Sequence, residues 1–203
     1  MPPRPRARRY DPAKTRAAVT AQLRHVRDAV RELDEERLDA SIRAGGRSVR
    51  ELIAHLSAEA EAEAEPEPEP ESGAGAADED ARALAARCAE LVVHTGDLAA
   101  ATGLDVPYDR QALATAVRLL ADALAAKAPG GSVELRIPPF AVVQCVEGPR
   151  HTRGTPPNVV ETDPLTWIRL AAGRTGWAEA LDAGEVTASG ERADLAAHLP
   201  VLD

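Results

Sequence analysis

Aromatic side chains are nearly absent from this chain, and their scarcity limits how its core can be built. Only 2% of the 203 residues are aromatic, whereas 44% are apolar. The core must therefore consist mainly of alanine, leucine and valine, which favours closely packed helices over an aromatic-rich β-sandwich. Alanine and leucine also have high helix propensities. A chain of this length can bury roughly 70% of the surface that its unfolded form exposes.

The negative charge of the chain is concentrated in one segment. The formal net charge is −9, but ten of the 33 acidic residues lie between Glu59 and Asp80, where no basic residue occurs. The other 23 acidic residues nearly balance the 24 basic ones. The remaining surface therefore lacks the basic footprint of a nucleic-acid-binding protein, and we expect no nucleic-acid partner.

The cysteines and the hydropathy of the chain bear on its compartment. Cys88 and Cys145 are far apart and lie in apolar segments, so we expect two buried free thiols. No apolar stretch follows the basic N-terminal residues, as a secretory signal would require. No run of about 18 apolar residues is present to span a membrane. These features predict a cytoplasmic protein without a membrane span.

The N-terminal region begins with a basic, proline-containing segment and then becomes helical. Residues 1–13 combine Pro and Arg with few apolar residues, which predicts a disordered basic tail. A transit peptide or a phosphate-binding arm is the alternative. From Lys14, apolar residues recur at steps of three and four, which is typical of a helix with one buried face. Ser48 and Glu51 have the spacing of a capping box that opens a second helix.

A low-complexity acidic segment separates the second helix from two more. The Glu-Pro repeats cannot continue a helix, so residues 65–78 are predicted to form an extended, solvated loop. Amphipathic patterns over 79–101 and about 109–127 predict the third and fourth helices, with Gly103 ending the former. Residues 14–128 are therefore interpreted as a four-helix bundle.

Residues 129–203 have a different pattern, typical of a small α+β domain. Its predicted order is β-β-β-α-α-β-α. The strands are SVELRI (132–137), FAVVQCV (140–146), NVVET (158–162) and EVTASG (185–190), the second of them more buried than the first. The helices are DPLTWIRLAAG (163–173), WAEALDAG (177–184) and ERADLAAHL (191–199). The whole chain is thus predicted to be an α+β protein made of a helical bundle and this domain.

Three residues of the bundle form a candidate metal site. Glu90 and His94 are four residues apart and project from the same side of the third helix, while His55 lies on the second helix. Two imidazoles and one carboxylate suit Zn²⁺ and leave a position for water or substrate. Other divalent transition metals accept the same ligands. Glu and His at this spacing are also common by chance, so a purely structural role is the alternative.

The segments that carry these residues resemble a known family. SVRELIAHL (48–56) and ELVVHTGDLAAATG (90–103) are similar to the two signature helices of the DinB and mycothiol-dependent maleylpyruvate isomerase family. The resemblance implies that His55, Glu90 and His94 bind a divalent metal, usually zinc. It also implies that Asp97 accepts a hydrogen bond from one of the ligands.

The sequence departs from that family at two places. Gly46-Arg47 stands where the family has Gly-Trp, and Glu-Pro repeats replace the connection between the two motifs. The loss of the Trp removes packing beside the site. A bundle that keeps the ligands without the isomerase activity is therefore one interpretation of this region.

The C-terminal region carries a longer resemblance. GPRHTRGTPPNVVE (148–161), the following DPLTWIRLAAGR (163–174) and the strand ending at Ser189-Gly190 resemble the bacterial orthologue of the sterol-carrier-protein domain. The resemblance implies an apolar cavity between a sheet and its helices. Fatty acyl chains, sterols or similar apolar molecules would be the ligands.

Candidate ligand-contacting residues lie in the same region. Trp167 falls on the helix expected to cover the cavity, and His151 and Arg153 lie in a stiff loop before Glu161. Arg153 either pairs with Glu161 or caps a helix, or it lines a mouth together with His151. Arg174 occupies a place where isomerase-like proteins carry an arginine, which implies an anion- or substrate-contacting role. Candidate wall residues, with mutual packing as the alternative, are Leu135, Ile137, Val142, Trp167, Ile168, Leu170 and Leu181.

Two functions are compatible with these patterns. The favoured hypothesis is a sterol-carrier-family protein that binds an apolar small molecule or lipid in its C-terminal domain, with a divalent-metal site in the bundle. The alternative is a metal-dependent enzyme that uses mycothiol for isomerisation or thiol transfer, with Arg174 as a catalytic residue. Zinc would then favour the thiolate form of the bound thiol. Whether the chain is an enzyme stays open at this point.

Overall fold

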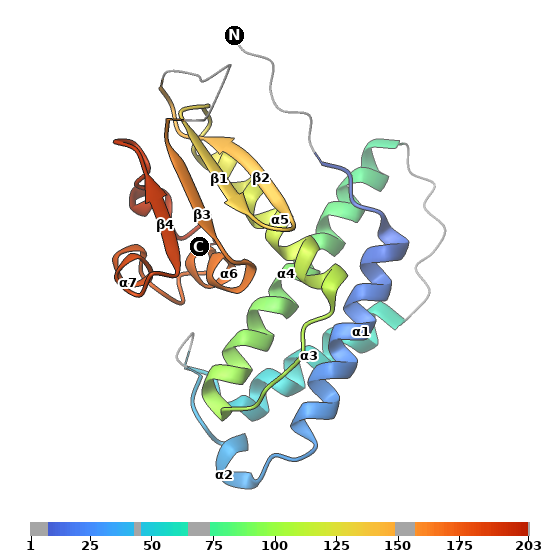
Figure 1. The fold of residues 1–203 in the computed structure, drawn as a ribbon. Helices are drawn as coiled ribbons and strands as arrows, with labels where there is room; N and C mark the ends of the chain where they lie inside the picture. The colour runs from blue at the N-terminus through green and yellow to red at the C-terminus, as the bar shows by residue number, and fades with distance from the viewer. Residues whose placement is uncertain (1–7, 43–45, 65–73, 149–156, 203) are drawn as a thin grey trace. The chain divides into compact units, whose positions relative to one another are not determined.

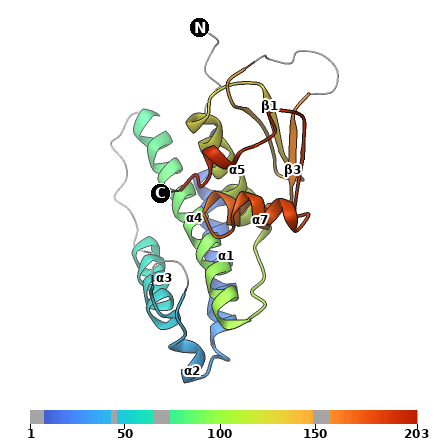
Figure 2. The same cartoon turned by 90° about the vertical axis from the view of Figure 1, so that its left-hand side faces the viewer.

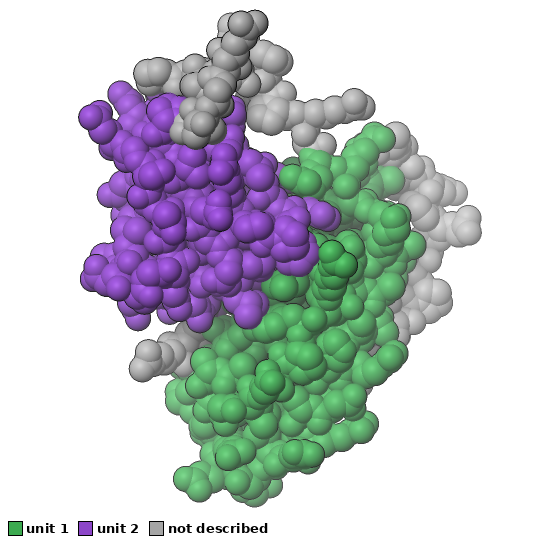
Figure 3. Space-filling view, in the orientation of Figure 1, with its two compact units in different colours: residues 1–115 green, residues 116–203 purple. Residues whose placement is uncertain are grey.

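The chain folds into helices and one mixed four-stranded sheet, which confirms the predicted α+β class. Contacts between Cα atoms divide the chain into two compact units, residues 1–115 and 116–203 (Figure 3). The limits predicted from sequence, 14–128 and 129–203, stay a prediction. The computed structural model describes residues 8–42, 46–64, 74–148 and 157–202.

The first unit is helical. Helix α1 packs against α4, and α3 packs against both (Figure 1). Each contributes an apolar stripe to the core, including Val19, Val26, Leu52, Leu56, Leu84, Leu91 and Leu98, all buried. The helices are α1 (Pro12–Val30), α2 (Glu35–Leu38), α3 (Val49–Ala64), α4 (Ala74–Thr102) and the first part of α5 (Arg110–Lys127).

Capping interactions determine where the first two long helices begin. The Asp11 carboxylate accepts a hydrogen bond from the Lys14 amide at 3.1 Å, and Pro12 occupies the first turn of α1. The helix therefore starts within the segment predicted as a disordered tail, whose residues 1–7 lie outside the described part. The predicted capping box of α3 is confirmed, because the Ser48 amide donates to Glu51 Oε2 at 2.8 Å and the Glu51 amide to Ser48 Oγ at 3.2 Å.

Two other boundaries differ from the prediction. Helix α4 begins at Ala74, so the last five residues of the predicted loop 65–78 are helical; residues 65–73 lie outside the described part. The short helix α2 was not predicted, and the Asp34 carboxylate caps it by accepting from the Arg37 amide at 2.9 Å. Gly103, at φ +71°, ends α4 as expected.

The second unit is built on a sheet with strand order β2-β1-β3-β4 (Figure 1). Strand β1 is antiparallel to β2 and parallel to β3, and β4 is antiparallel to β3. Strands β1 and β3 therefore lie next to each other in the sheet, although β2 lies between them in the sequence. The strands are β1 (Val133–Ile137), β2 (Ala141–Cys145), β3 (Val159–Thr162) and β4 (Val186–Ser189).

Helices of the same unit cover one face of this sheet. Both α5 and α6 lie on one side of the strands in the two perpendicular views (Figures 1 and 2). Helix α5 is tied to the hairpin by the Arg118 Nε–Phe140 O bond at 3.1 Å and the Val146 N–Ala128 O bond at 2.8 Å. The remaining elements are α6 (Pro164–Ala171), α7 (Trp177–Asp182) and the short 3₁₀ helix η1 (Ala196–His198).

The Asp-Pro start of α6 is confirmed, whereas the predicted closing helix is wrong. Partial burial acts to raise the pKa of Asp163, but hydrogen bonds from Thr166 and Leu165 outweigh it, and the pKa is lowered. The closing segment 191–199 forms only the single turn η1. Leu195 of this segment is fully buried, so the segment packs as a loop around the Leu195 side chain.

The two faces of the sheet differ in burial. Val133, Leu135 and Ile137 of β1 alternate with half-buried Glu134 and Arg136. Strand β2, predicted to be more buried than β1, alternates as well, with Val142 60% exposed. The strand has one buried face because the helices of this unit cover only one side of the sheet. In the described part of the chain, no helix is long and apolar enough to cross a membrane.

Candidate functional site

An apolar layer lies between the sheet and the helices of the second unit. Its members are aliphatic or aromatic, come from sheet and helix alike, and are at most 5% exposed. This burial places most of the predicted wall residues in one layer, while Leu181 is half-buried. The fully or nearly fully buried members are Val117, Leu120, Leu124, Leu135, Ile137, Val160, Trp167, Ile168, Leu170 and Leu195.

Trp167 brings the one polar atom of its side chain into this layer. The side chain is 1% exposed, and its Nε1 finds no hydrogen-bond acceptor among the described residues. Indole nitrogen can only donate. A buried donor without a partner costs about 1–3 kcal/mol. The layer therefore contains a polar site that an oxygen atom of a guest molecule would satisfy.

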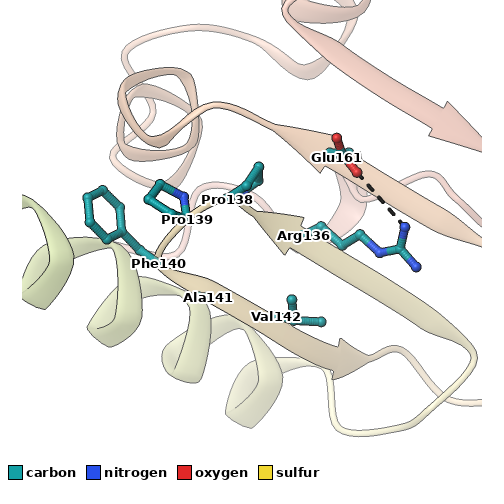
Figure 4. A pocket seen from close by; sticks show the side chains of 7 residues that line it. All are labelled: Arg136, Pro138, Pro139, Phe140, Ala141, Val142 and Glu161. Carbon is teal, nitrogen blue, oxygen red and sulfur yellow. Dashed lines mark ion pairs between the residues drawn. The ribbon is translucent and has the colours of Figure 1, made fainter.

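A groove lies on the other face of the sheet (Figure 4). It has a volume of about 410 Å³, and its lining is mostly apolar. The predicted wall residue Val142 lines this groove and not the inner layer, because it pairs with Arg136 on the exposed face. The lining residues are Arg136, Pro138, Pro139, Phe140, Ala141, Val142 and Glu161.

This groove is not among the sites predicted from the sequence. The signal was present in the Pro-Pro-Phe segment (138–140), which places three apolar residues in the turn between β1 and β2. Apolar residues in such a turn remain near the surface, since the connection runs outside the sheet. The groove therefore combines a sheet face with an apolar turn.

Charged side chains form the other end of the groove. Arg136 donates from Nε and Nη2 to Glu134 Oε1, at 2.8 and 2.7 Å. Its Nη1 lies 4.0 Å from Glu161 Oε2, which is an ion pair beyond hydrogen-bonding distance (Figure 4). The three side chains on this face carry a net charge of −1, because two carboxylates share one guanidinium.

In the first unit, the structure brings His55 and His94 together. Their ring centroids are 6.0 Å apart in an edge-to-face arrangement, and both side chains are half-buried. Asp97 is buried, and its Oδ2 lies 3.5 Å from His94 Nδ1. This position agrees with the implied support of a ligand by Asp97.

Glu90 is not part of that cluster in the structure. Its side chain is exposed, although it lies one turn before His94 on α4. Among the described residues, no group of three or more His, Cys, Asp or Glu side chains is arranged to hold a metal ion. The described residues therefore do not assemble the three predicted ligands, and metal binding at His55, Glu90 and His94 stays a prediction.

Three candidate residues remain, of which the structure describes Arg174. His151 and Arg153 fall outside the described residues. Arg174 is exposed in the turn after α6, where its Nη1 donates to the Ala172 carbonyl at 3.0 Å. Its role in anion or substrate contact stays a prediction. Both cysteines are buried free thiols, as expected, and burial raises the pKa of Cys145 to about 11.

The C-terminal half can be compared with known families on this basis. Residues 109–201 match the bacterial SCP ortholog family. The match confirms the predicted sterol-carrier resemblance for this part of the chain. It starts at the beginning of α5, so this SCP-ortholog region includes the helix that covers the sheet as well as the sheet itself.

The match leaves the N-terminal helices without an assigned family. It covers slightly less than half of the chain, and the predicted DinB-like character of the bundle stays a prediction. Among curated proteins, none matches this chain. The helices before residue 109 are therefore interpreted only from their own residues.

Proposed function

We propose that the SCP-ortholog region binds an apolar small molecule or lipid in the layer between the sheet and its helices. The observation that carries this proposal is the buried Trp167 indole without an acceptor. A guest with an apolar body and one oxygen would place its body among aliphatic side chains. Its oxygen would accept the indole hydrogen and remove the cost of the unpaired donor.

The apolar composition of the layer supports this ligand class. Its members are mainly leucine, isoleucine and valine, with Trp167 as the one aromatic side chain. A predominantly apolar lining with few polar groups is typical of binding sites for apolar small molecules. Fatty acids, fatty alcohols and sterols all have the required apolar body and oxygen head.

The experiment compares two tryptophan variants of the full chain. A fluorescent fatty acid is titrated into the protein, and its own emission is followed as unlabelled 1-dodecanol displaces it. Trp167→Phe removes the indole donor and should weaken dodecanol binding about fivefold, in keeping with the loss of one hydrogen bond. Trp177→Phe is the matched control and should leave the affinity unchanged, because Trp177 is a half-buried residue of α7 outside the layer. Failure of every lipid class to displace the probe, or equal effects of both variants, would overturn the proposal.

For the first unit we propose a divalent-metal site at His55 and His94. The close approach of the two rings and the Asp97 carboxylate next to His94 support it. Imidazole ligands are commonly oriented by such a carboxylate. When bound, the metal supplies a positive charge that favours the thiolate form of a coordinated thiol such as mycothiol. The third ligand is Glu90 in the family resemblance, and Asp97 is a carboxylate whose Oδ2 lies 3.5 Å from His94 Nδ1 in the structure.

The metal proposal is tested by elemental analysis of protein purified without a histidine tag. We expect close to one zinc ion per chain, and His94→Ala should abolish it. His25→Ala is the control, since His25 lies outside both motifs and its Nδ1 lies 3.1 Å from the Pro107 carbonyl. Comparing Glu90→Gln with Asp97→Asn identifies the third ligand. Zinc bound equally by the His94 and His25 variants would exclude this site.

A further inference from the structure

We propose that the exposed face of the sheet carries a second binding site, whose ligand is an amphipathic amine. The apolar part of the ligand lies in the groove formed by the turn residues and Val142, and its ammonium group lies at Glu161. This site is separate from the layer around Trp167. Arg136 and Glu161 alternate with the buried residues of β1 and β3, so they face away from that layer.

The apolar end of the groove is exposed where burial would be expected. Val142 is 60% exposed on an edge strand, and the adjacent prolines 138 and 139 are exposed too. Phe140 is half-buried, and its carbonyl is fixed by Arg118. Figure 4 shows the two prolines and Phe140 together at the turn, with Val142 further along β2. Covering these side chains would remove apolar surface from water, which is favourable by about 25 cal/mol per Å².

The charged end of the groove has one carboxylate more than it has cations. Glu134 already accepts two hydrogen bonds from Arg136, so this pair is satisfied. Among the residues that the structure describes, the ion pair of Glu161 is the one with Arg136 at 4.0 Å, and its side chain is exposed. Its oxygen atoms can therefore accept hydrogen bonds from a new donor.

These charges select an amine over a carboxylate as the head group. An ammonium group would bring the net charge of the cluster from −1 to zero and donate hydrogen bonds to Glu161. A carboxylate would face two like charges and a guanidinium that is already engaged by Glu134. Thr187, which pairs with Glu161 across β3 and β4, adds an exposed hydroxyl next to the head group.

The test is a set of titrations of the isotope-labelled full chain, followed through its backbone amide signals. Decylamine, decanol and decanoate have the same chain and differ only in the head group. We expect saturable shifts at Phe140, Val142 and Glu161, with affinity falling in the order amine, alcohol, carboxylate. Glu161→Gln should reduce the preference for amine over carboxylate by about threefold or more, as for an exposed ion pair.

A pair of matched variants locates the site. Val142 and Gln144 are both exposed on the same face of β2, and only Val142 lines the groove. Val142→Lys should weaken decylamine binding at least about tenfold, because it fills the groove and repels the amine. Gln144→Lys adds the same charge outside the groove and should change the affinity by less than about threefold. Displacement of the fluorescent fatty acid from the Trp167 layer should be unaffected by either variant.

Several outcomes would overturn the inference. Decanoate binding as tightly as decylamine would exclude the head-group selection. Equal effects of Val142→Lys and Gln144→Lys would exclude the groove. Loss of lipid binding in the Trp167 assay, by contrast, leaves these titrations unchanged, so the two proposals fail independently.

Discussion

Two glycines of the second unit have similar backbone angles and very different surroundings. Gly190 has φ +103° and Gly184 has φ +70°, both in the left-handed region that favours glycine. A Cβ at Gly190 would collide with the Pro157 carbonyl and the Asn158 side chain, whereas a Cβ at Gly184 would meet nothing within 4 Å. Asn158 itself is buried and bridges the Ser132 carbonyl and the Arg192 amide.

We therefore predict that Gly190→Ala is clearly more destabilising than Gly184→Ala. The Gly184 variant should lose about 1 kcal/mol from backbone strain alone. The Gly190 variant should lose about 3 kcal/mol, since the clash adds displacement of the buried Asn158. Urea unfolding monitored by circular dichroism measures both. Equal losses would mean that the Gly190 turn can relax away from Asn158.

Cys145 allows a second prediction at this scale. Its side chain is fully buried and burial raises its pKa to about 11, so only about 0.1% is thiolate at pH 8, against about a quarter for an ordinary cysteine. Native protein should therefore react with iodoacetamide at Cys145 far more slowly than urea-unfolded protein. Because the folded-state pKa of this acid is raised, stability should also fall as pH rises above about 9. Peptide mapping by mass spectrometry measures the labelling; equal rates in both states would contradict the prediction.

At the scale of elements, the capping box formed by Ser48 and Glu51 stabilises the start of α3. Ser48→Ala removes the acceptor of the Glu51 amide and should cost about 1 kcal/mol, which lowers the melting temperature by about 2–4 °C. Hydrogen bonds from the Ser48 amide and hydroxyl lower the pKa of Glu51. The contribution of Glu51 is therefore present at neutral pH and is lost as pH falls through its lowered value.

The control for this prediction is Ser57→Ala. Ser57 lies in the middle of the same helix, half-buried and away from its ends, so alanine there should be neutral or slightly stabilising. Thermal denaturation of both variants at pH 7 and pH 3.5 separates the two effects. A Ser48 variant as stable as the Ser57 variant at pH 7 would show that the box does not stabilise α3.

At the scale of the whole molecule, the family match and the contacts indicate where a self-sufficient fragment should begin. The match starts at residue 109, next to the first residue of α5. Hydrogen bonds of Arg118, Lys127 and Ala128 connect α5 and the residue after it to the rest of the unit. The Lys127 Nζ, for example, donates to the Pro200 carbonyl at 2.7 Å. We predict that a fragment of residues 105–203 folds cooperatively. A fragment of 129–203 lacks α5 and should not, because the apolar face of the sheet loses its cover.

Circular dichroism and thermal unfolding of the two fragments measure this directly. A single sharp transition is expected for the longer fragment and a broad, weak one for the shorter fragment. Cooperative unfolding of 129–203 alone would show that α5 belongs to the bundle, as the sequence-based boundary implies. The unfolding of the two fragments thus shows whether the C-terminal domain begins before or after α5.

Most secondary structure was predictable because it depends on local patterns. Helix α3 begins where Ser48 and Glu51 allow a capping box, and α4 ends at Gly103 because only a residue tolerant of positive φ fits there. The closing segment was mispredicted as a helix, since its alanines and leucines have high helix propensity. Packing around the buried Leu195 reduced it to one 3₁₀ turn, which is a tertiary effect.

The sequence by itself determined the order of the long helices and of the strands, the apolar residues available for the core and the sterol-carrier resemblance of the C-terminal part. Only the tertiary structure decided which of these residues meet. Strand pairing places Val142 on the exposed face with Arg136. Helix packing leaves Trp167 Nε1 without an acceptor among the described residues, and it brings His55 to His94 while Glu90 stays exposed. These are contacts between residues distant in sequence. They depend on register and helix rotation, which one-dimensional patterns constrain only weakly.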